Sequence, residues 1–225
     1  MKHAQKKNLI LLWLAQAISQ AGDAIYQLAL LWLVLDMTHS TVITGIIAMS
    51  AYLPALIFGL YAGVFSDRMN RFKLMIFSNA GQALTVLLIP LVLWYGHENV
   101  WLICGFAFIR SCFNTLFQPA LQSFIPMLFP PERIVKINAI LVTSGHIAWM
   151  IGPFFAGMLL SILSIKYLFL VDAASFLLGL SLLLFITQPI HFSQPEDHSH
   201  WSELKPVSYT HLRAHETSLH LVCRL

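Results

Sequence analysis

Residues 63–73 read GVFSDRMNRFK, in which a glycine, an Asp-Arg pair and two further cations stand between two long apolar runs. Residues 42–65 lead into this charged segment and residues 74–95 follow it. Each run is long enough to cross roughly 30 Å of hydrocarbon as a helix. A soluble core gives no reason to place such a segment between apolar runs of that length. The segment is therefore predicted to be a short loop between two membrane spans.

The composition places the whole chain in a membrane. Of its 225 residues 58% are apolar and 10% are charged, and the mean hydropathy is +0.73, which leaves too little polar surface to cover a soluble globule. The apolar runs predict six spans: 9–35, 42–65, 74–95, 100–121, 138–163 and 167–186. Barrel strands would alternate polar with apolar residues, and these runs do not. The predicted fold is an all-α membrane protein, a bundle of six antiparallel transmembrane helices within residues 1–187.

Basic residues predict the orientation, because segments rich in Lys and Arg stay in the cytoplasm. In the predicted topology Lys166 lies on the outer side, and the inner side carries Lys2, Lys6, Lys7, Arg68, Arg71, Lys73, Arg133 and Lys136. Both chain ends are thus predicted to be cytoplasmic. The net charge of +3 is explained by these inner cations and requires no nucleic-acid partner.

The first span carries a polar stripe. Its members recur at spacings of three and four residues, which aligns them on one helix face: Gln16, Ser19, Gln20, Asp23 and Gln27. A carboxylate in a span costs about 2.5–3.5 kcal/mol on insertion scales, so Asp23 should face a partner or water rather than lipid. Two interpretations stand. The stripe bonds helices together, or it lines a cavity in which Asp23 titrates or binds a cation.

The fourth span carries the opposite charge, Arg110, at a depth that overlaps with that of Asp23. An Asp23–Arg110 pair across the bundle is therefore predicted, either as a static buried salt bridge or as a functional pair. Asp172, near the outer end of the sixth span, is predicted to be structural and accessible to water, where the helix dipole favours a carboxylate. His146 in the fifth span is predicted to be a hydrogen-bonded packing residue.

Small residues and prolines complete the pattern. Small residues repeat every four positions along two spans, which lets helix backbones approach closely: Ala51, Ala55, Gly59 and Gly63, then Ala148, Gly152 and Ala156. Prolines lie deep in four spans and predict kinks: Pro54, Pro90, Pro119 and Pro153. The spans show no nucleophile with a base, no cofactor motif and no metal-ligand cluster, so neither an enzyme nor a cofactor or metal is predicted.

The charged segment resembles a signature of the major facilitator superfamily of secondary transporters. Gly63, Asp67, Arg68 and Arg71 match its pattern G-x-x-x-D-R-x-x-R, which lies in the cytoplasmic loop after the second helix. The resemblance implies that Asp67 and Arg71 belong to a cytoplasmic gate, a latch of ion pairs and helix dipoles. The alternative is a topology anchor, which explains the cations but not Asp67 or Gly63.

Two further motifs carry the resemblance, which covers residues 8 to about 205. Arg110 is similar to the arginine of the fourth-helix motif, with Phe113 and Asn114 in place of the usual Gln and Gly. The stretch Gly152-Pro153-Phe154-Phe155-Ala156-Gly157 resembles the fifth-helix motif of antiporters, with Ala148 where a glycine is more usual.

Finer details resemble the bacterial branch of macrolide-efflux and enterobactin-exporter-like proteins. They are Ser19-x-x-Gly22-Asp23, Phe117-Gln118-Pro119-Ala120, Pro130-Pro131-Glu132-Arg133, Asn138-Ala139 and Asp172-Ala173-Ala174-Ser175-Phe176. The resemblance implies alternating access by two six-helix halves, each built from two inverted three-helix repeats. This chain would be the N-terminal half of a proton-coupled efflux transporter of small amphipathic molecules in the bacterial inner membrane. Its partners would be the substrate, the lipid bilayer and a second six-helix half, with a proton gradient in place of a cofactor.

The end of the chain differs from the rest. Residues 188–205 are predicted to be a solvated central loop, although a metal site at its histidines, His191, His198 and His200, is conceivable. Residues 206–225 read PVSYTHLRAHETSLHLVCRL, which resembles translated sequencing adapter, and they are predicted to be a non-native tail. Two alternatives therefore stay open, a non-transporting membrane fragment and a subunit of a membrane ion-conducting complex.

Overall fold

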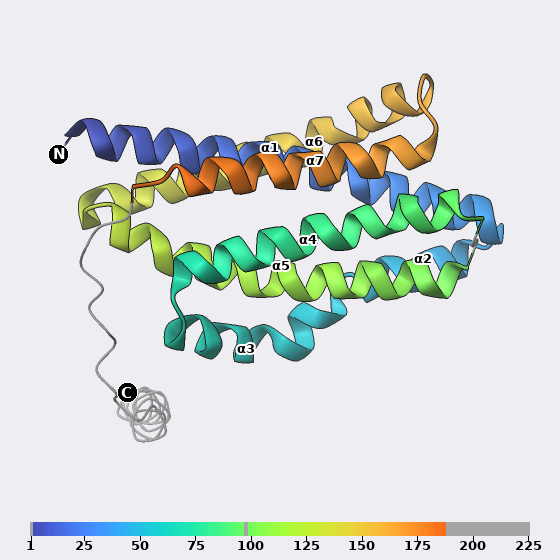
Figure 1. Cartoon of the computed structure of the whole chain (residues 1–225), viewed down its shortest axis with the longest axis horizontal. Coiled ribbons are helices and arrows are strands. Elements are labelled where there is room, and N and C mark those ends of the chain that lie inside the picture. The colour runs from blue at the N-terminus through green and yellow to red at the C-terminus, as the bar shows by residue number, and fades with distance from the viewer. Residues whose placement is uncertain (1, 97–98, 188–225) are drawn as a thin grey trace, which may run out of the picture. The chain divides into compact units, whose positions relative to one another are not determined.

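The computed structural model describes residues 2–96 and 99–187, and this part of the chain is helical without strands. Figure 1 shows its helices: α1 (Lys2–Thr38), α2 (Thr41–Ser50), α3 (Leu53–Arg68), α4 (Arg71–Trp94), α5 (Val100–Leu128), α6 (Pro131–Leu160) and α7 (Ile165–Leu184). The predicted central loop, its histidines and the predicted tail lie outside the described residues.

Six stretches are long and apolar enough to cross a membrane. They are Gln5–Thr38, Thr41–Gly59, Arg71–Trp94, Val100–Leu128, Pro131–Leu160 and Ile165–Leu184. Each overlaps one predicted span. The all-α bundle of six spans is therefore confirmed.

The predicted span 42–65 is two helices in the structure, which corrects that prediction. Ala51 and Tyr52 separate α2 from α3. Pro54, the second residue of α3, has no N–H to donate to the preceding turn, and its ring would clash with a carbonyl of a continuous helix. At the break the Ala51 carbonyl accepts a hydrogen bond from the Ser111 hydroxyl of α5. The break is thus fastened to a neighbouring helix.

The helices also extend into the predicted polar loops. Most of residues 63–73 is helical, and Met69 and Asn70 alone link α3 to α4. Asn70 caps α4, because its side-chain oxygen accepts hydrogen bonds from the N–H groups of Phe72 and Lys73. Such a cap satisfies donors that a helix start leaves unpaired, so the loop needs few residues.

The segment between the predicted spans 100–121 and 138–163 is also shorter than predicted. α5 runs on to Leu128, and α6 begins at Pro131 instead of residue 138. Proline suits the first position of a helix, where its missing N–H is not needed, and Glu132 in the first turn favours the helix dipole.

The helix contacts follow a twofold pattern. α1 packs against α6 and α7, α5 packs against α3 and α4, and α4 packs against α7. Exchanging α1 with α5, α2 and α3 with α6, and α4 with α7 reproduces this set of contacts. Each repeat holds three spans joined by short loops, so the second repeat starts on the opposite side of the membrane. The contacts agree with two inverted three-helix repeats (Figure 1).

Two apolar clusters fill the bundle and leave a polar band between them. On α1, for example, Ala15 belongs to one cluster and Ile25 to the other. The stretches between the clusters on α1, α4 and α5 carry buried polar side chains: Gln16, Ser19, Ser78, Asn79, Gln82 and Ser111. The polar residues of different spans therefore gather at one level of the bundle.

Candidate functional site

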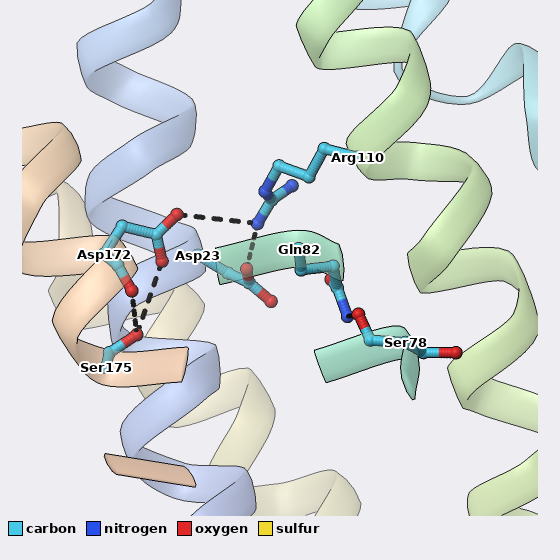
Figure 2. Close-up of polar contacts among 6 residues, drawn as sticks. All are labelled: Asp23, Ser78, Gln82, Arg110, Asp172 and Ser175. Carbon is cyan, nitrogen blue, oxygen red and sulfur yellow. Dashed lines mark hydrogen bonds and ion pairs between the residues drawn. The ribbon is translucent and has the colours of Figure 1, made fainter. Parts of the chain in front are cut away.

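Arg110 lies at the centre of a buried cluster of charged side chains (Figure 2). Its Nη2 atom is paired with Oδ1 of Asp23 on α1 and lies 3.8 Å from Oδ2 of Asp172 on α7. The exposed fractions of the three side chains are 12% for Arg110, 21% for Asp23 and 0% for Asp172. One guanidinium from α5 thus stands between two carboxyl groups from two other helices.

Aromatic rings support the Arg110 guanidinium. Its central carbon lies 4.0 Å from the ring centroid of Tyr26 and 5.5 Å from that of Phe176. The Tyr26 ring in turn packs edge-on against Phe169. An arginine over an aromatic face is attracted by the ring quadrupole, and more strongly where water is excluded. The rings therefore hold the cation in place while its Nη2 group faces the two carboxyl groups.

The position of Asp172 corrects the prediction that water reaches it. Its side chain is fully buried, although it lies in the first half of α7. Ser175 donates a hydrogen bond to the Asp172 backbone carbonyl at 2.7 Å, and its hydroxyl lies 3.4 Å from Asp172 Oδ1. Oδ2 has no hydrogen-bond partner among the described residues. The prediction was wrong because α1 packs against this part of α7, where Gly22 lies next to Asp172 and Ser175.

Gly22 allows α1 and α7 to close over Asp172. A Cβ atom placed on Gly22 would lie 2.1 Å from the Ser175 hydroxyl oxygen and 2.6 Å from Asp172 Oδ1. Real Cβ contacts are not that short, so any larger residue would force the two helices apart. The Gly22-Asp23 pair therefore supplies both the close approach and one of the two acids.

The polar stripe of the first span lies at helix contacts. Gln16 and Ser19 are buried, and Gln20 and Gln27 are partly buried. Gln20 donates a hydrogen bond to Gln16 at 3.1 Å. Gln20 also faces α6, since a Cβ on Gly145 would lie 2.1 Å from its Oε1 atom. Asp23 is the member of the stripe that the structure brings to Arg110.

Buried amides on α4 were missed by the sequence reasoning. Asn79 and Gln82 are 3% and 2% exposed, and the Gln82 amide donates to the Ser78 carbonyl at 3.4 Å. Figure 2 shows Gln82 and Ser78 together with the charged cluster. Their spacing of three and four residues in an otherwise apolar run was the available signal. They extend the polar band from α1 to α4.

The charged segment lies at the α3–α4 junction, apart from the Arg110 cluster. Arg68 is exposed in the last turn of α3. Arg71, the first residue of α4, donates to the Met127 sulfur of α5 at 3.3 Å. Gly63 is partly buried, and a Cβ there would meet nothing within 4 Å. The side chain of Asp67 lies outside what the structure describes.

The small residues of the fifth span pack as expected at one position. Gly152 is buried against α1, where a Cβ would lie 2.3 Å from that of Ala24. Ala148 is partly buried, whereas Pro153 and Gly157 are exposed. The corresponding ridge of α3 meets no helix of the described part at its glycines, because a Cβ added to Gly59, as to Gly63, would have open space around it. Close packing inside this bundle is therefore shown for α6 and not for α3.

A buried cluster with two acids and one base can bind a proton or exchange ion-pair partners, because each charge depends on the others for compensation. Within the described ranges no group of three or more His, Cys, Asp or Glu side chains lies close enough together to hold a metal ion.

Comparison with known proteins finds one matching family model and several related proteins. A family model described as Major Facilitator Superfamily matches residues 12–221. Macrolide efflux protein A of Streptococcus pyogenes is 28% identical over 167 residues, which cover 74% of this chain and 41% of that protein.

Two further relatives are an uncharacterized MFS-type transporter, YfiS, of Bacillus subtilis and the Staphyloferrin A transporter of Staphylococcus aureus. YfiS is 31% identical over 80% of this chain and 42% of its own length. The Staphyloferrin A transporter is 27% identical over 83% of this chain and 47% of its own length. The chain spans less than half the length of each of these relatives.

Proposed function

This chain belongs to the major facilitator superfamily, and we propose that it forms the N-terminal half of a proton-coupled efflux transporter. In this proposal a second six-helix half completes the protein, and the two halves rock about a central cavity. The fraction of each relative that the chain spans, 41% for macrolide efflux protein A, supports the assignment to one half.

The main support for proton coupling is the buried cluster of Asp23, Arg110 and Asp172. Ionisable side chains in spans are costly and typically mark ion or proton pathways. Here three of them meet at one level of the bundle, beside a band of buried amides and hydroxyls. A static scaffold gains little from such a group, because an apolar core of the same volume is often as stable.

The names of two relatives support a proposal for the substrate class. Macrolide efflux protein A is named for the efflux of macrolides, and the Staphyloferrin A transporter is named for staphyloferrin A. From the first name we extend to this chain the direction of transport, and we propose a small amphipathic molecule as the exported substrate. The lipid bilayer is the second partner, since large apolar side chains of α3 and α6 are exposed, such as Leu56, Tyr61 and Phe154.

The orientation and the gate belong to the same proposal. Basic residues at one end of the bundle favour a cytoplasmic location for both chain ends in a bacterial inner membrane. The α3–α4 junction would then lie on the cytoplasmic side. There Asp67, Arg68 and Arg71 would form the latch toward the second half, with Gly63 leaving room for a helix of that half.

Transport in inside-out vesicles tests the proposal. Vesicles from cells that express the complete gene product are given an interior-acid pH gradient and a radiolabelled macrolide. We expect accumulation that a protonophore abolishes, and we expect Asp23→Asn to lose it because the coupling carboxyl is gone. Asp36→Asn is the matched control, since Asp36 lies exposed near the end of the same helix.

Two results would count against the proposal. Accumulation in the Asp23→Asn variant at the wild-type level would remove Asp23 from the coupling mechanism. No gradient-driven uptake by wild-type protein present in the membrane, for macrolides and siderophores alike, would favour a non-transporting membrane protein or an ion-conducting subunit.

A further inference from the structure

We infer that Asp172 is a second proton-binding carboxyl group, which shares Arg110 with Asp23 and holds a proton whenever Arg110 is paired with Asp23. The inference deepens the proposed function and rests on it for its role in transport. Two carboxyl groups of the cluster face one guanidinium, and all three side chains are largely buried.

The charge balance requires one neutral acid. If Asp23 and Asp172 were both ionised, the cluster would carry a net charge of −1 among apolar side chains. A buried charge without a counter-ion is strongly unfavourable, and a group so placed takes up a proton instead. With one proton the cluster is neutral, and each buried charge has a partner.

The geometry assigns this proton to Asp172. Asp23 makes the direct ion pair with Arg110, and its side chain keeps 21% of its exposure. Asp172 lies 3.8 Å from the guanidinium, beyond hydrogen-bond distance, and is fully buried. Its Oδ2 atom makes no hydrogen bond within the described part of the chain. An ionised carboxylate would leave this oxygen uncompensated, whereas a protonated carboxyl tolerates such surroundings.

The other polar groups near Asp172 do not change the charge balance of the cluster. α1 contributes Asp23 and Tyr26, α5 contributes Arg110, and α7 itself contributes Ser175. The part of α4 in the polar band carries neutral amides, Asn79 and Gln82. His146, the histidine of α6, is exposed. Among the described side chains Arg110 is therefore the cation that the two acids share.

The two acids can exchange states without net charge movement. In one state Asp23 is ionised and paired with Arg110, and Asp172 carries the proton. In the other Asp172 has lost its proton and pairs with Arg110, and Asp23 has gained one proton. Each state holds one proton, one carboxylate and one guanidinium, so the step is balanced. Asp23 is the more exposed of the two acids, at 21% against 0% for Asp172, so we assign proton entry and exit to Asp23 and storage of the proton to Asp172.

Infrared spectroscopy of the purified, complete gene product in lipid nanodiscs tests the protonation directly. At neutral pH we expect one protonated-carboxyl band that shifts on transfer to D₂O. Asp172→Asn removes the acid that carries the proton, so the band should disappear. Asp23→Asn leaves Arg110 with Asp172 as its one acid, so Asp172 should ionise and the band should disappear as well.

Two further variants assign the band. Ser175→Ala should shift its position without removing it, because the Ser175 hydroxyl lies 3.4 Å from Asp172 Oδ1. Asp36→Asn should leave it unchanged. The inference is overturned if wild-type protein shows no such band, if the band survives in Asp172→Asn, or if Ser175→Ala leaves its position unaltered.

A transport assay then separates this inference from the proposed function. Asp172→Asn mimics the protonated acid, so we expect substrate-for-substrate exchange to persist and pH-driven accumulation to be lost. Accumulation at the wild-type level in this variant overturns the role of Asp172 while the proposed function stands. If the wild-type protein shows the band but transports nothing, the proposed function fails and the protonation of Asp172 stands.

Discussion

At the scale of single residues, the cluster around Arg110 depends on one glycine as much as on its charges. Gly22 precedes Asp23 on α1 and lets Asp172 and Ser175 of α7 come against the α1 backbone. The pairing of Asp23 with Arg110 could be anticipated from depth and charge alone. The third member, Asp172, could not, because the covering helices that bury it are a property of the assembled bundle.

Gly22→Ala tests this close approach. The added methyl group would overlap Ser175 and Asp172, and overpacking of this kind typically costs about 1–3 kcal/mol. We therefore expect a clear fall in thermal stability in detergent, together with a loss of pH-driven transport. Gly105→Ala is the matched control, since a Cβ there meets nothing within 4 Å and alanine favours the helix by about 0.5–1 kcal/mol. Equal melting temperatures of the two variants would contradict the close approach.

At the scale of elements, the break between α2 and α3 is the main departure from the predicted spans. Hydropathy indicated one run over 42–65, and the period of the apolar residues does not distinguish one helix from two short ones. Pro54 predicted a disturbance, but its size depends on Ser111 of α5, which gives the Ala51 carbonyl a partner. A helix broken inside a span needs such replacement bonds. The sequence therefore indicates where the helix breaks, and tertiary contacts determine the geometry of the break.

A double-mutant cycle tests the link between the break and α5. Ser111→Ala leaves the Ala51 carbonyl without this donor, which we expect to cost about 0.5–1.5 kcal/mol of stability. In the Pro54→Ala background a continuous helix can form, in which the Ala55 N–H donates to the Ala51 carbonyl, so the same change should cost much less. Ser181→Ala is the control, because its hydroxyl bonds within its own helix. Additive effects of Ser111→Ala and Pro54→Ala would contradict the link.

At the scale of the whole molecule, the sequence predicted the six spans and their membrane character, since both follow from composition and run length. The helix contacts add the internal symmetry: α1 and α5 hold equivalent places in two three-span repeats. Asp23 and Arg110, the two residues of the ion pair, come from these equivalent helices. The cluster therefore lies where the two repeats meet, which is also where transporters of inverted repeats place their binding sites.

Substrate-driven proton movement tests the central claim most directly. The complete gene product is reconstituted in liposomes that contain a pH-sensitive dye and hold an imposed pH gradient. Addition of a macrolide should dissipate this gradient in wild-type liposomes and leave it intact in liposomes with Asp23→Asn or Asp172→Asn, because each variant breaks the proton exchange at Arg110. Two results would contradict coupling through this cluster. The pH gradient could persist in wild-type liposomes despite measured macrolide transport, or it could collapse in liposomes with either variant as fast as in wild-type liposomes.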